Sequence, residues 1–442
     1  MGLFFCIILF AAGGTLAWAV LSRRRQYRYR PDRDYAYAPE SSAVEVLPLS
    51  LDGETCSIVY GEGQTVIVRC RIRSRWYGRL LQPYVETASE NGTRRHYVEH
   101  GARGARYLDL TEAAAGERTV RFRAHRCRIE KTMTLFRYEN PLDGDAKVLV
   151  LAPHADDAEI AAFGLYAGHD AHIVTITAGE DGKCDYCDLF DSVPEGRMEK
   201  GLLRVHDALH IPDLGGVGVA RCAVLGYYGM TLKQMYAQRG KTVPSNVPGV
   251  ASFAAFRRTS HTSFIGNSAP ETAWDSLVRD LQSALEILRP DVVVTPHPQI
   301  DSNSDHVYTT VALAEAMRNS GYGGRVLAYT NHHALGESYP CGPIFSTATL
   351  PPWFESPFAF DGIYSHALPR AAQVRKFFAL EAMHDLRDAT LPLSLAKTWK
   401  QLKRMLKRDL GGRDKSYFRR AVRTNELFYV FDAKSLESAI KR

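Results

Sequence analysis

The sequence has little cysteine, and what it has forms no framework. Eight cysteines are scattered over 442 residues, which excludes a small disulfide-rich scaffold and agrees with a reducing compartment. The one close pair is Cys184 and Cys187. It lacks a second pair at metal-binding distance in the sequence, which argues against a structural zinc knuckle. A loop disulfide and two unrelated thiols both remain open.

The sequence also lacks a strong charge of either sign and any nucleic-acid-binding motif. Its formal net charge is +6, and much of the excess lies in an N-terminal arginine stretch and in the segment 397–420. Such local basic runs suit an anionic membrane surface better than a nucleic-acid groove, although a solvated face also explains the C-terminal run. The glycines of 215–218 lack the preceding strand and following helix of a phosphate-binding loop. We therefore expect no nucleic-acid partner.

Only one long apolar run is present, over residues 3–21. As a helix it would span roughly 28 Å, about one hydrocarbon core. Arginines follow the run instead of preceding it, which argues against a cleaved signal peptide and places the rest of the chain in the cytoplasm. The sequence thus predicts a single-pass membrane anchor over 1–22 and a basic juxtamembrane linker over 23–40. The alternative is a signal sequence leading to a periplasmic or secreted protein.

Residues 41–143 read as short strands separated by turns. Apolar and polar residues alternate in 119–123 and 132–136, the period of a half-buried strand, and further apolar runs cover 56–60 and 65–72. Turn residues such as Asn91-Gly92 separate them. We predict a small all-β sandwich here. Its role, sugar binding or a spacer beside the next domain, stays open.

The pattern changes at 144–442 to alternating strands and helices, which predicts an α/β domain with a Rossmann-like, mostly parallel sheet covered by helices. Expected strands are 147–152, 172–177, 291–295 and 325–330. Expected helices are 158–167, 192–210, 268–288 and 307–317, two of them opened by capping boxes at Ser192 and Ser268. A basic amphipathic helix over 397–408 forms a C-terminal extension that either packs on the domain or lies on a membrane.

Two clusters of acids and histidines follow two of these strands. His154, Asp156 and Asp157 come directly after the first, and Asp305 and His306 follow 291–295 after a polar loop. Ligands of parallel sheets bind beyond the carboxyl ends of the strands. His154, Asp157 and His306 can therefore bind one Zn²⁺, with Asp156 as a base for water and Asp305 orienting an imidazole. Helix capping by an aspartate is the competing explanation of the first cluster.

The segment 153–159, Pro-His-Ala-Asp-Asp-Ala-Glu, and the later Asp305-His306 resemble the signature motifs of the PIG-L/LmbE-type zinc-dependent de-N-acetylases. The resemblance covers about residues 146–385. It implies that His154, Asp157 and His306 bind zinc, that Asp156 is the general base, and that the substrate is an N-acetylated amino sugar, often on a lipid carrier.

The sequence departs from the pattern of that family at one catalytic position, residue 303. Many members of that family have a histidine at the position of Asn303, which can donate a hydrogen bond but cannot transfer a proton. We expect Asn303 to assist as a hydrogen-bond donor. His297, His332 or His333, each near the end of a predicted strand, are candidates for substrate binding and for the missing proton transfer.

The sequence therefore predicts a membrane-anchored, zinc-dependent amidohydrolase acting on an N-acetyl amino sugar of an envelope glycolipid or its precursor. The alternative is a glycan-binding protein that retains the fold with weakened chemistry. A phosphoesterase would need a second metal site, and no further carboxylate cluster in the sequence is placed to form one.

Overall fold

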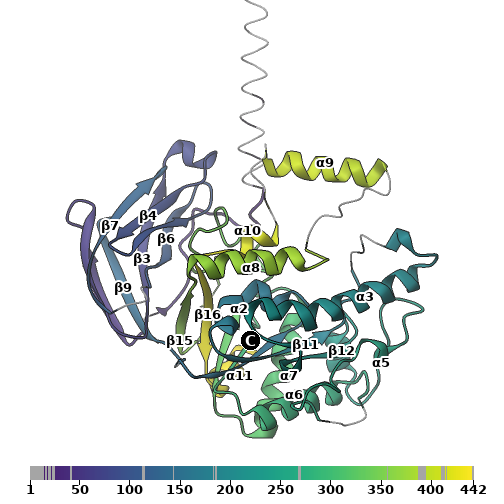
Figure 1. Ribbon diagram of the computed structural model, residues 1–442. Helices are drawn as coiled ribbons and strands as arrows, with labels where there is room; N and C mark the ends of the chain where they lie inside the picture. Colours follow the sequence, from purple (N-terminus) through teal and green to yellow (C-terminus); the bar gives the residue numbers. More distant parts are fainter. Residues whose placement is uncertain are drawn as a thin grey trace, which may run out of the picture.

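The computed structural model describes residues 25–39, 42–111, 115–142, 144–182, 184, 187–266, 270–355, 357–386, 395–409, 414 and 416–440, with isolated positions before residue 25. In this part of the chain the fold is mixed α/β, with one mixed sheet and two antiparallel sheets (Figure 1).

The α/β part is built on a seven-stranded sheet in the described residues. Its strand order is β12 (Cys222–Tyr227), β11 (Asp170–Thr177), β10 (Lys147–Ala152), β13 (Val292–Pro296), β14 (Arg325–Tyr329), β16 (Asn425–Phe431) and β15 (Gly362–Ala367). The first five strands run parallel, and β16 pairs antiparallel with both of its neighbours. The predicted, mostly parallel sheet is confirmed.

Helices cover both faces of this sheet, because alternate side chains of each central strand point to opposite faces. Leu149 and Leu151 of β10 belong to a core shared with α6, α7 and α11, whereas Val148 and Val150 pack with α2, α3 and α8. The helices are α2 (Asp157–Ala167), α3 (Val193–His210), α4 (Leu232–Ala237), α5 (Phe253–Phe256), α6 (Trp274–Leu288), α7 (Ser304–Ser320), α8 (Arg370–Ala382), α9 (Leu395–Asp409), α10 (Tyr417–Ala421) and α11 (Ala433–Ile440). Short 3₁₀ turns lie at Trp76–Arg79, Cys187–Leu189, Ile211–Gly215 and Val219–Arg221.

Helix starts show where capping patterns work and where they mislead. The Ser192 hydroxyl accepts a hydrogen bond from the amide of Glu195 at 3.3 Å, as the capping box predicts for α3. Helix α6 instead begins at Trp274, after an N-cap residue without a side-chain cap, so the start predicted near Ser268 is wrong; Ser268 itself lies outside the described residues. The helix ends at Leu288 because Arg289 adopts a left-handed conformation before Pro290.

The residues from 45 to 139 form two antiparallel sheets. One is ordered β1 (Glu45–Ser50), β9 (Thr132–Glu139), β3 (Gln64–Ser74) and β6 (Arg103–Asp109), with β8 (Cys127–Ile129) also paired to β3. The other is ordered β2 (Thr55–Tyr60), β7 (Gly116–His125), β4 (Tyr84–Ser89) and β5 (Gly92–Tyr97). Residues of both sheets share one core. To that extent the predicted sandwich is confirmed, while the predicted domain limits stay a prediction.

The β part is packed firmly against the α/β part. The other face of its first sheet, including Ile67 and Phe136, contributes to the same core as β10 and α7. The Asp109 carboxylate of β6 accepts hydrogen bonds from Asn425 (2.6 Å) and Ser365 (2.5 Å) of the large sheet. Within residues 25–39, Tyr27, Tyr35 and Tyr37 are buried, and Tyr35 and Tyr37 belong to the same shared core. The linker predicted over 23–40 stays a prediction.

No helix in the described part of the chain is both long and apolar enough to cross a bilayer. This finding overturns the membrane localisation predicted from the sequence, together with the cytoplasmic orientation derived from it. The predicted anchor, residues 1–22, lies almost wholly outside the described residues. Helix α9 forms as expected, and its Trp399, Leu402 and Met405 side chains are exposed.

Candidate metal centre

The two predicted clusters meet at one edge of the large sheet. His154 and Asp157 follow β10, and His306 lies in the first turn of α7, which follows the neighbouring strand β13. The His154 Nδ1 and Asp157 Oδ2 atoms are 3.2 Å apart, His306 Nε2 lies 3.0 Å from the same Oδ2, and the two imidazole nitrogens are 3.2 Å apart. These are the only described residues whose ligand atoms gather closely enough to hold a metal ion.

This donor set fits zinc. Zn–N and Zn–O bonds of about 2.1 Å in a tetrahedron place ligand atoms about 3.4 Å apart, slightly more than the observed separations. Asp157 and His306 are buried, and the His154 side chain is 13% exposed, so the site opens on the side of His154. Three protein ligands with an open fourth position are the arrangement of a hydrolytic site and not of a closed structural one.

Each imidazole is oriented by a carboxylate behind it. His306 Nδ1 lies 3.0 Å from Asp301 Oδ2, and His154 Nε2 lies 3.3 Å from Asp305 Oδ2. Histidine ligands commonly donate their second N–H in this way, which fixes the tautomer that leaves the other nitrogen free for the metal. Asp305 thus lies beside an imidazole, and its role in orienting that ring stays a prediction. The role of Asp301 was missed, and its only signal was its place five residues before His306.

The contacts within the site shift the pKa values of its three candidate ligands. Burial lowers the pKa of His154, but the carboxylates of Asp157 and Asp305 outweigh this effect and raise it to about 9. Burial likewise lowers the pKa of His306, and Asp157 with Asp301 raises it well above its usual value. Burial raises the pKa of Asp157, whereas the two imidazoles hold it well below its ordinary range. Three carboxylates, those of Asp157, Asp301 and Asp305, thus surround the two imidazoles, and this negative charge also favours a divalent cation.

Asp156 caps α2 by position but makes no side-chain capping hydrogen bond. Its Oδ1 accepts instead from Arg204 Nη2 of α3 at 3.1 Å, and Arg204 also pairs with Asp385. Both Asp156 and Arg204 are largely buried. The capping explanation of this aspartate is therefore not supported, and its carboxylate is held beside the metal cluster. Arg204 had no signal in the sequence, where it is one more charged residue on a helix.

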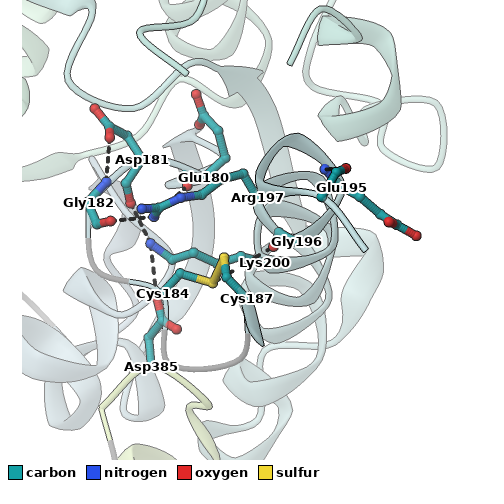
Figure 2. Close-up of a disulfide and its surroundings, with 11 residues drawn as sticks. Glu180, Asp181, Gly182, Cys184, Cys187, Glu195, Gly196, Arg197, Lys200 and Asp385 are labelled. Carbon is teal, nitrogen blue, oxygen red and sulfur yellow. Dashed lines mark hydrogen bonds and ion pairs between the residues drawn. A yellow bond between two sulfur atoms is a disulfide. The ribbon is translucent and has the colours of Figure 1, made fainter. Parts of the chain in front are cut away.

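A disulfide closes the loop that leads into α3. Cys184 and Cys187 are bonded, one of the two alternatives left by the sequence. Figure 2 shows Arg197 and Lys200 of α3 reaching to backbone carbonyls of the neighbouring loop at Gly182 and Asp181. Lys200 Nζ also lies 3.7 Å from Asp385 Oδ2, the carboxylate that Arg204 contacts. These contacts therefore link the disulfide loop, through Asp385 and Arg204, to Asp156, the candidate general base.

Gly179 shows how closely this loop approaches α3. Its φ is +65°, and a Cβ at this position would lie 2.4 Å from Arg204 Nε. Only glycine satisfies both the backbone conformation and the space. The next residue, Glu180, is buried and accepts hydrogen bonds from the Gly229 amide (2.9 Å) and the Ser245 hydroxyl (2.8 Å), which fixes the loop from its other side.

The remaining histidine candidates differ in position. The His332 ring lies 5.0 Å from that of His306, and its side chain is 23% exposed, so it reaches the rim of the site. His333 does not: its Nε2 contacts the Pro352 carbonyl at 2.9 Å, and burial lowers its pKa to about 4. His297 is also fully buried away from the cluster, among aromatic rings including Phe358, and burial lowers its pKa to about 3. The structure therefore gives no support to substrate-binding roles for His297 and His333.

Asn303 has a structural task. It is the N-cap of α7, where its Oδ1 accepts from the Asp305 amide at 2.9 Å. From the sequence, only the histidines next to Asn331 were candidates for the site. In the structure, Asn331 itself donates from Nδ2 to Asp157 Oδ1 at 2.7 Å. This contact holds the carboxylate so that its other oxygen faces the two imidazoles.

Comparison with known proteins agrees with this geometry. Residues 149–317 match the model of the PIG-L family, described as GlcNAc-PI de-N-acetylase. The segment holds all three cluster residues, and the match confirms the PIG-L resemblance and supports the class of metal-dependent de-N-acetylases. No curated protein sequence matches the chain significantly.

Several solved structures are similar over about two thirds of the chain. Teicoplanin deacetylase Orf2 in its zinc-inhibited form is 13% identical (TM-score 0.35), covering 65% of this chain and 98% of its own. The A40926 pseudoaglycone deacetylase Dbv21 is 18% identical (TM-score 0.34), with the same coverage. GalB, a 4-carboxy-2-hydroxymuconate hydratase from Pseudomonas putida, is 17% identical (TM-score 0.33), covering 64% and 95%. At these scores the similarities carry no functional argument.

Proposed function

We propose that this protein hydrolyses the N-acetyl group of an amino sugar with the help of a zinc ion held by His154, Asp157 and His306. The observation that supports this most is the meeting of three ligand atoms within about 3.2 Å of one another, each imidazole backed by its own carboxylate. We further propose that this amino sugar is part of an envelope glycolipid or its precursor.

When bound, zinc would polarise the acetyl carbonyl and lower the pKa of a coordinated water to about 7. Asp156 would accept the proton of the attacking water, because its carboxylate lies next to Asp157 and is held by Arg204. As the C–O bond forms and the C–N bond breaks, the proton passes to the leaving amine. The products are acetate and the free amino sugar.

His332 is the group we propose for stabilising the developing charge on the carbonyl oxygen or protonating the amine. Its ring lies beside His306 and partly faces solvent, and its Nδ1 is 3.8 Å from Glu337 Oε1. Asn303 can contribute only through its Nδ2, since its Oδ1 caps α7.

A non-catalytic glycan-binding protein is the second candidate, because Asn303 stands where an imidazole would provide proton transfer and is engaged as a helix cap. Acetate release from N-acetylglucosaminyl substrates, measured together with zinc content, separates the two. The proposed function requires bound zinc and turnover that Asp156→Ala abolishes. Bound zinc without turnover on any N-acetyl amino sugar would favour the glycan-binding protein.

The substrate itself can be identified by mass spectrometry of purified envelope glycolipids. Cells that carry only Asp156→Ala should accumulate a species heavier by one acetyl group than that of wild-type cells. Identical glycolipid profiles would remove the glycolipid from the proposal but leave the deacetylase reaction standing.

A further inference from the structure

A polar cavity adjoins the residues that follow β14. It has a volume of about 60 Å³, several times the roughly 10–15 Å³ that one water needs. Its charged and amide side chains come from several elements: Asn331 after β14, Lys376 of α8, Arg420 of α10, Arg423 just after α10, and Asn425 and Glu426 of β16, with the hydroxyl of Thr330 beside them. None of the three candidate metal ligands lines this cavity, which shares only Asn331 with the surroundings of the metal centre described above.

Two of the cations around this cavity are paired with carboxylates. Lys376 pairs with Glu426 at 2.7 Å, and Arg420 pairs with Glu337. Arg423 makes no ion pair with any described residue. Its two Nη atoms donate to the Ser346 hydroxyl and to backbone carbonyls, among them Cys341 O at 2.7 Å and Pro340 O at 3.0 Å. A guanidinium that is 1% exposed thus carries its charge into the protein interior without a carboxylate.

A second arginine increases the excess of positive charge. Arg419 is 7% exposed and also donates to carbonyl oxygens, including Glu337 O at 3.1 Å. Burial lowers the pKa of Arg423 to about 9 and that of Arg419 to about 10. The surroundings therefore stabilise these charges less than water does, and a buried anion would supply what is missing.

Hydrogen-bond donors are also left over at the cavity wall. The Nε atoms of Arg420 and Arg423 and the Thr330 hydroxyl are buried, and none has a hydrogen-bond partner in the described part of the chain. Buried polar atoms nearly always have partners, and unpaired ones call for an unseen water or ligand. Three unpaired donors around one cavity, in a positive field, match the acceptor oxygens of a carboxylate or phosphate.

We propose that this cavity, formed by Thr330, Arg420 and Arg423, is a binding site for a small oxyanion of about the size of acetate. The site does not depend on the proposed reaction, although that reaction would provide one source of acetate. It is linked to the metal centre by Asn331, and Arg420 also pairs with Glu337, whose Oε1 lies 3.8 Å from His332 Nδ1. Arg420 Nη1 donates to the Asn331 carbonyl at 3.1 Å, and Asn331 Nδ2 donates to Asp157.

The test is calorimetric titration of the zinc-loaded full chain with sodium acetate and, separately, with inorganic phosphate, at constant ionic strength. Acetamide, the neutral analogue of acetate, is the control ligand. We expect saturable binding of at least one anion and none of acetamide. The anion that binds more tightly identifies the source, a carboxylate or a phosphate.

Variants locate the binding. Thr330→Val keeps the shape of the side chain and should weaken anion binding about ten-fold, the effect of one lost hydrogen bond to a charged group. Thr309→Val of α7 is the matched control, since its hydroxyl is also buried without a partner in the described chain but does not line the cavity. Arg423→Gln should weaken binding at least as much; if it fails to fold, Thr330→Val still decides.

His306→Ala distinguishes binding in this cavity from binding at the metal centre, because an anion bound at the metal centre would be lost together with the metal. The proposal is overturned if neither anion binds, if acetamide binds equally, if Thr330→Val and Thr309→Val have the same affinity, or if binding is lost in His306→Ala. Absence of deacetylase activity in the same preparation would not affect this outcome.

Discussion

Replacement of Asp301 by asparagine tests whether the imidazole of His306 is prepared for a metal. The Asp301 Oδ2 atom lies 3.0 Å from His306 Nδ1 and also accepts from the amides of Asn331 and His332 at 3.1 Å, and both side chains of the histidine–aspartate pair are fully buried. An asparagine keeps one acceptor oxygen but loses the charge that orients the ring and makes it a better ligand.

The expected loss follows from what such carboxylates contribute elsewhere. Removing one typically weakens metal affinity 10–100-fold, which corresponds to about 1.4–2.8 kcal/mol. Asp305→Asn should cost less, because its contact with His154 is longer, at 3.3 Å. The assay is competition for zinc between the folded protein and a chromophoric chelator.

Asp280→Asn is the matched control. Asp280 is another buried aspartate, paired with Arg257 at 2.8 Å on α6, away from the cluster. Its loss should lower thermal stability and leave zinc affinity unchanged. A zinc affinity of Asp301→Asn within two-fold of wild type, or an equal loss in Asp280→Asn, would refute the reasoning.

Three further predictions concern the base, its support and acid stability. Asp156→Asn should lower kcat by about 10²–10⁴-fold with zinc content unchanged, and a loss of zinc as well would show that Asp156 acts as a ligand instead. Arg204→Met should lower kcat about ten-fold or more, because the contact with Asp156 at 3.1 Å is lost. The control Arg239→Met removes the more exposed pairing of Arg239 with Glu315 and should leave kcat unchanged. Equal rates in the two variants would contradict a positioning role for Arg204. Burial holds the pKa of His297 at about 3, against 6.5 in the unfolded chain, so the unfolded state takes up the proton first and stability falls as pH drops from 6.5 toward 3. At pH 5 this residue should cost up to about 2 kcal/mol, and denaturant unfolding of His297→Asn at pH 5 and pH 7 should show a correspondingly smaller difference.

Much of the metal site follows from local sequence. The chain must turn at the sheet edge after a buried strand such as β10, which is followed by Pro153 and His154, and the acids after it must lie there. The same holds for His306 after β13, and adjacent parallel strands bring the two ends together. The Ser192 cap was predictable for the same reason, because its partner lies only three residues away.

Contacts made across the fold could not be predicted in this way. The pairing of Arg204 with Asp156 and the contact of Asn331 with Asp157 depend on side chains from separate elements. The contact of Asp301 with His306 is local, but it depends on how the loop before α7 is folded. Likewise, similar histidine patterns end differently: His332 reaches the site, whereas the adjacent His333 is buried against the Pro352 carbonyl. Neighbouring side chains on an extended backbone point to opposite sides, and only packing decides which side faces the metal.

By itself, the sequence determined the type of sheet, the two clusters at its edge and the family resemblance, because each depends on periodicity or on residues close together in the chain. Tertiary structure alone decided which carboxylates support the ligands, which histidine is within reach, and that three arginines lie buried beside an unfilled set of hydrogen-bond donors. Burial and long-range contact set those properties, and neither can be read from the order of residues.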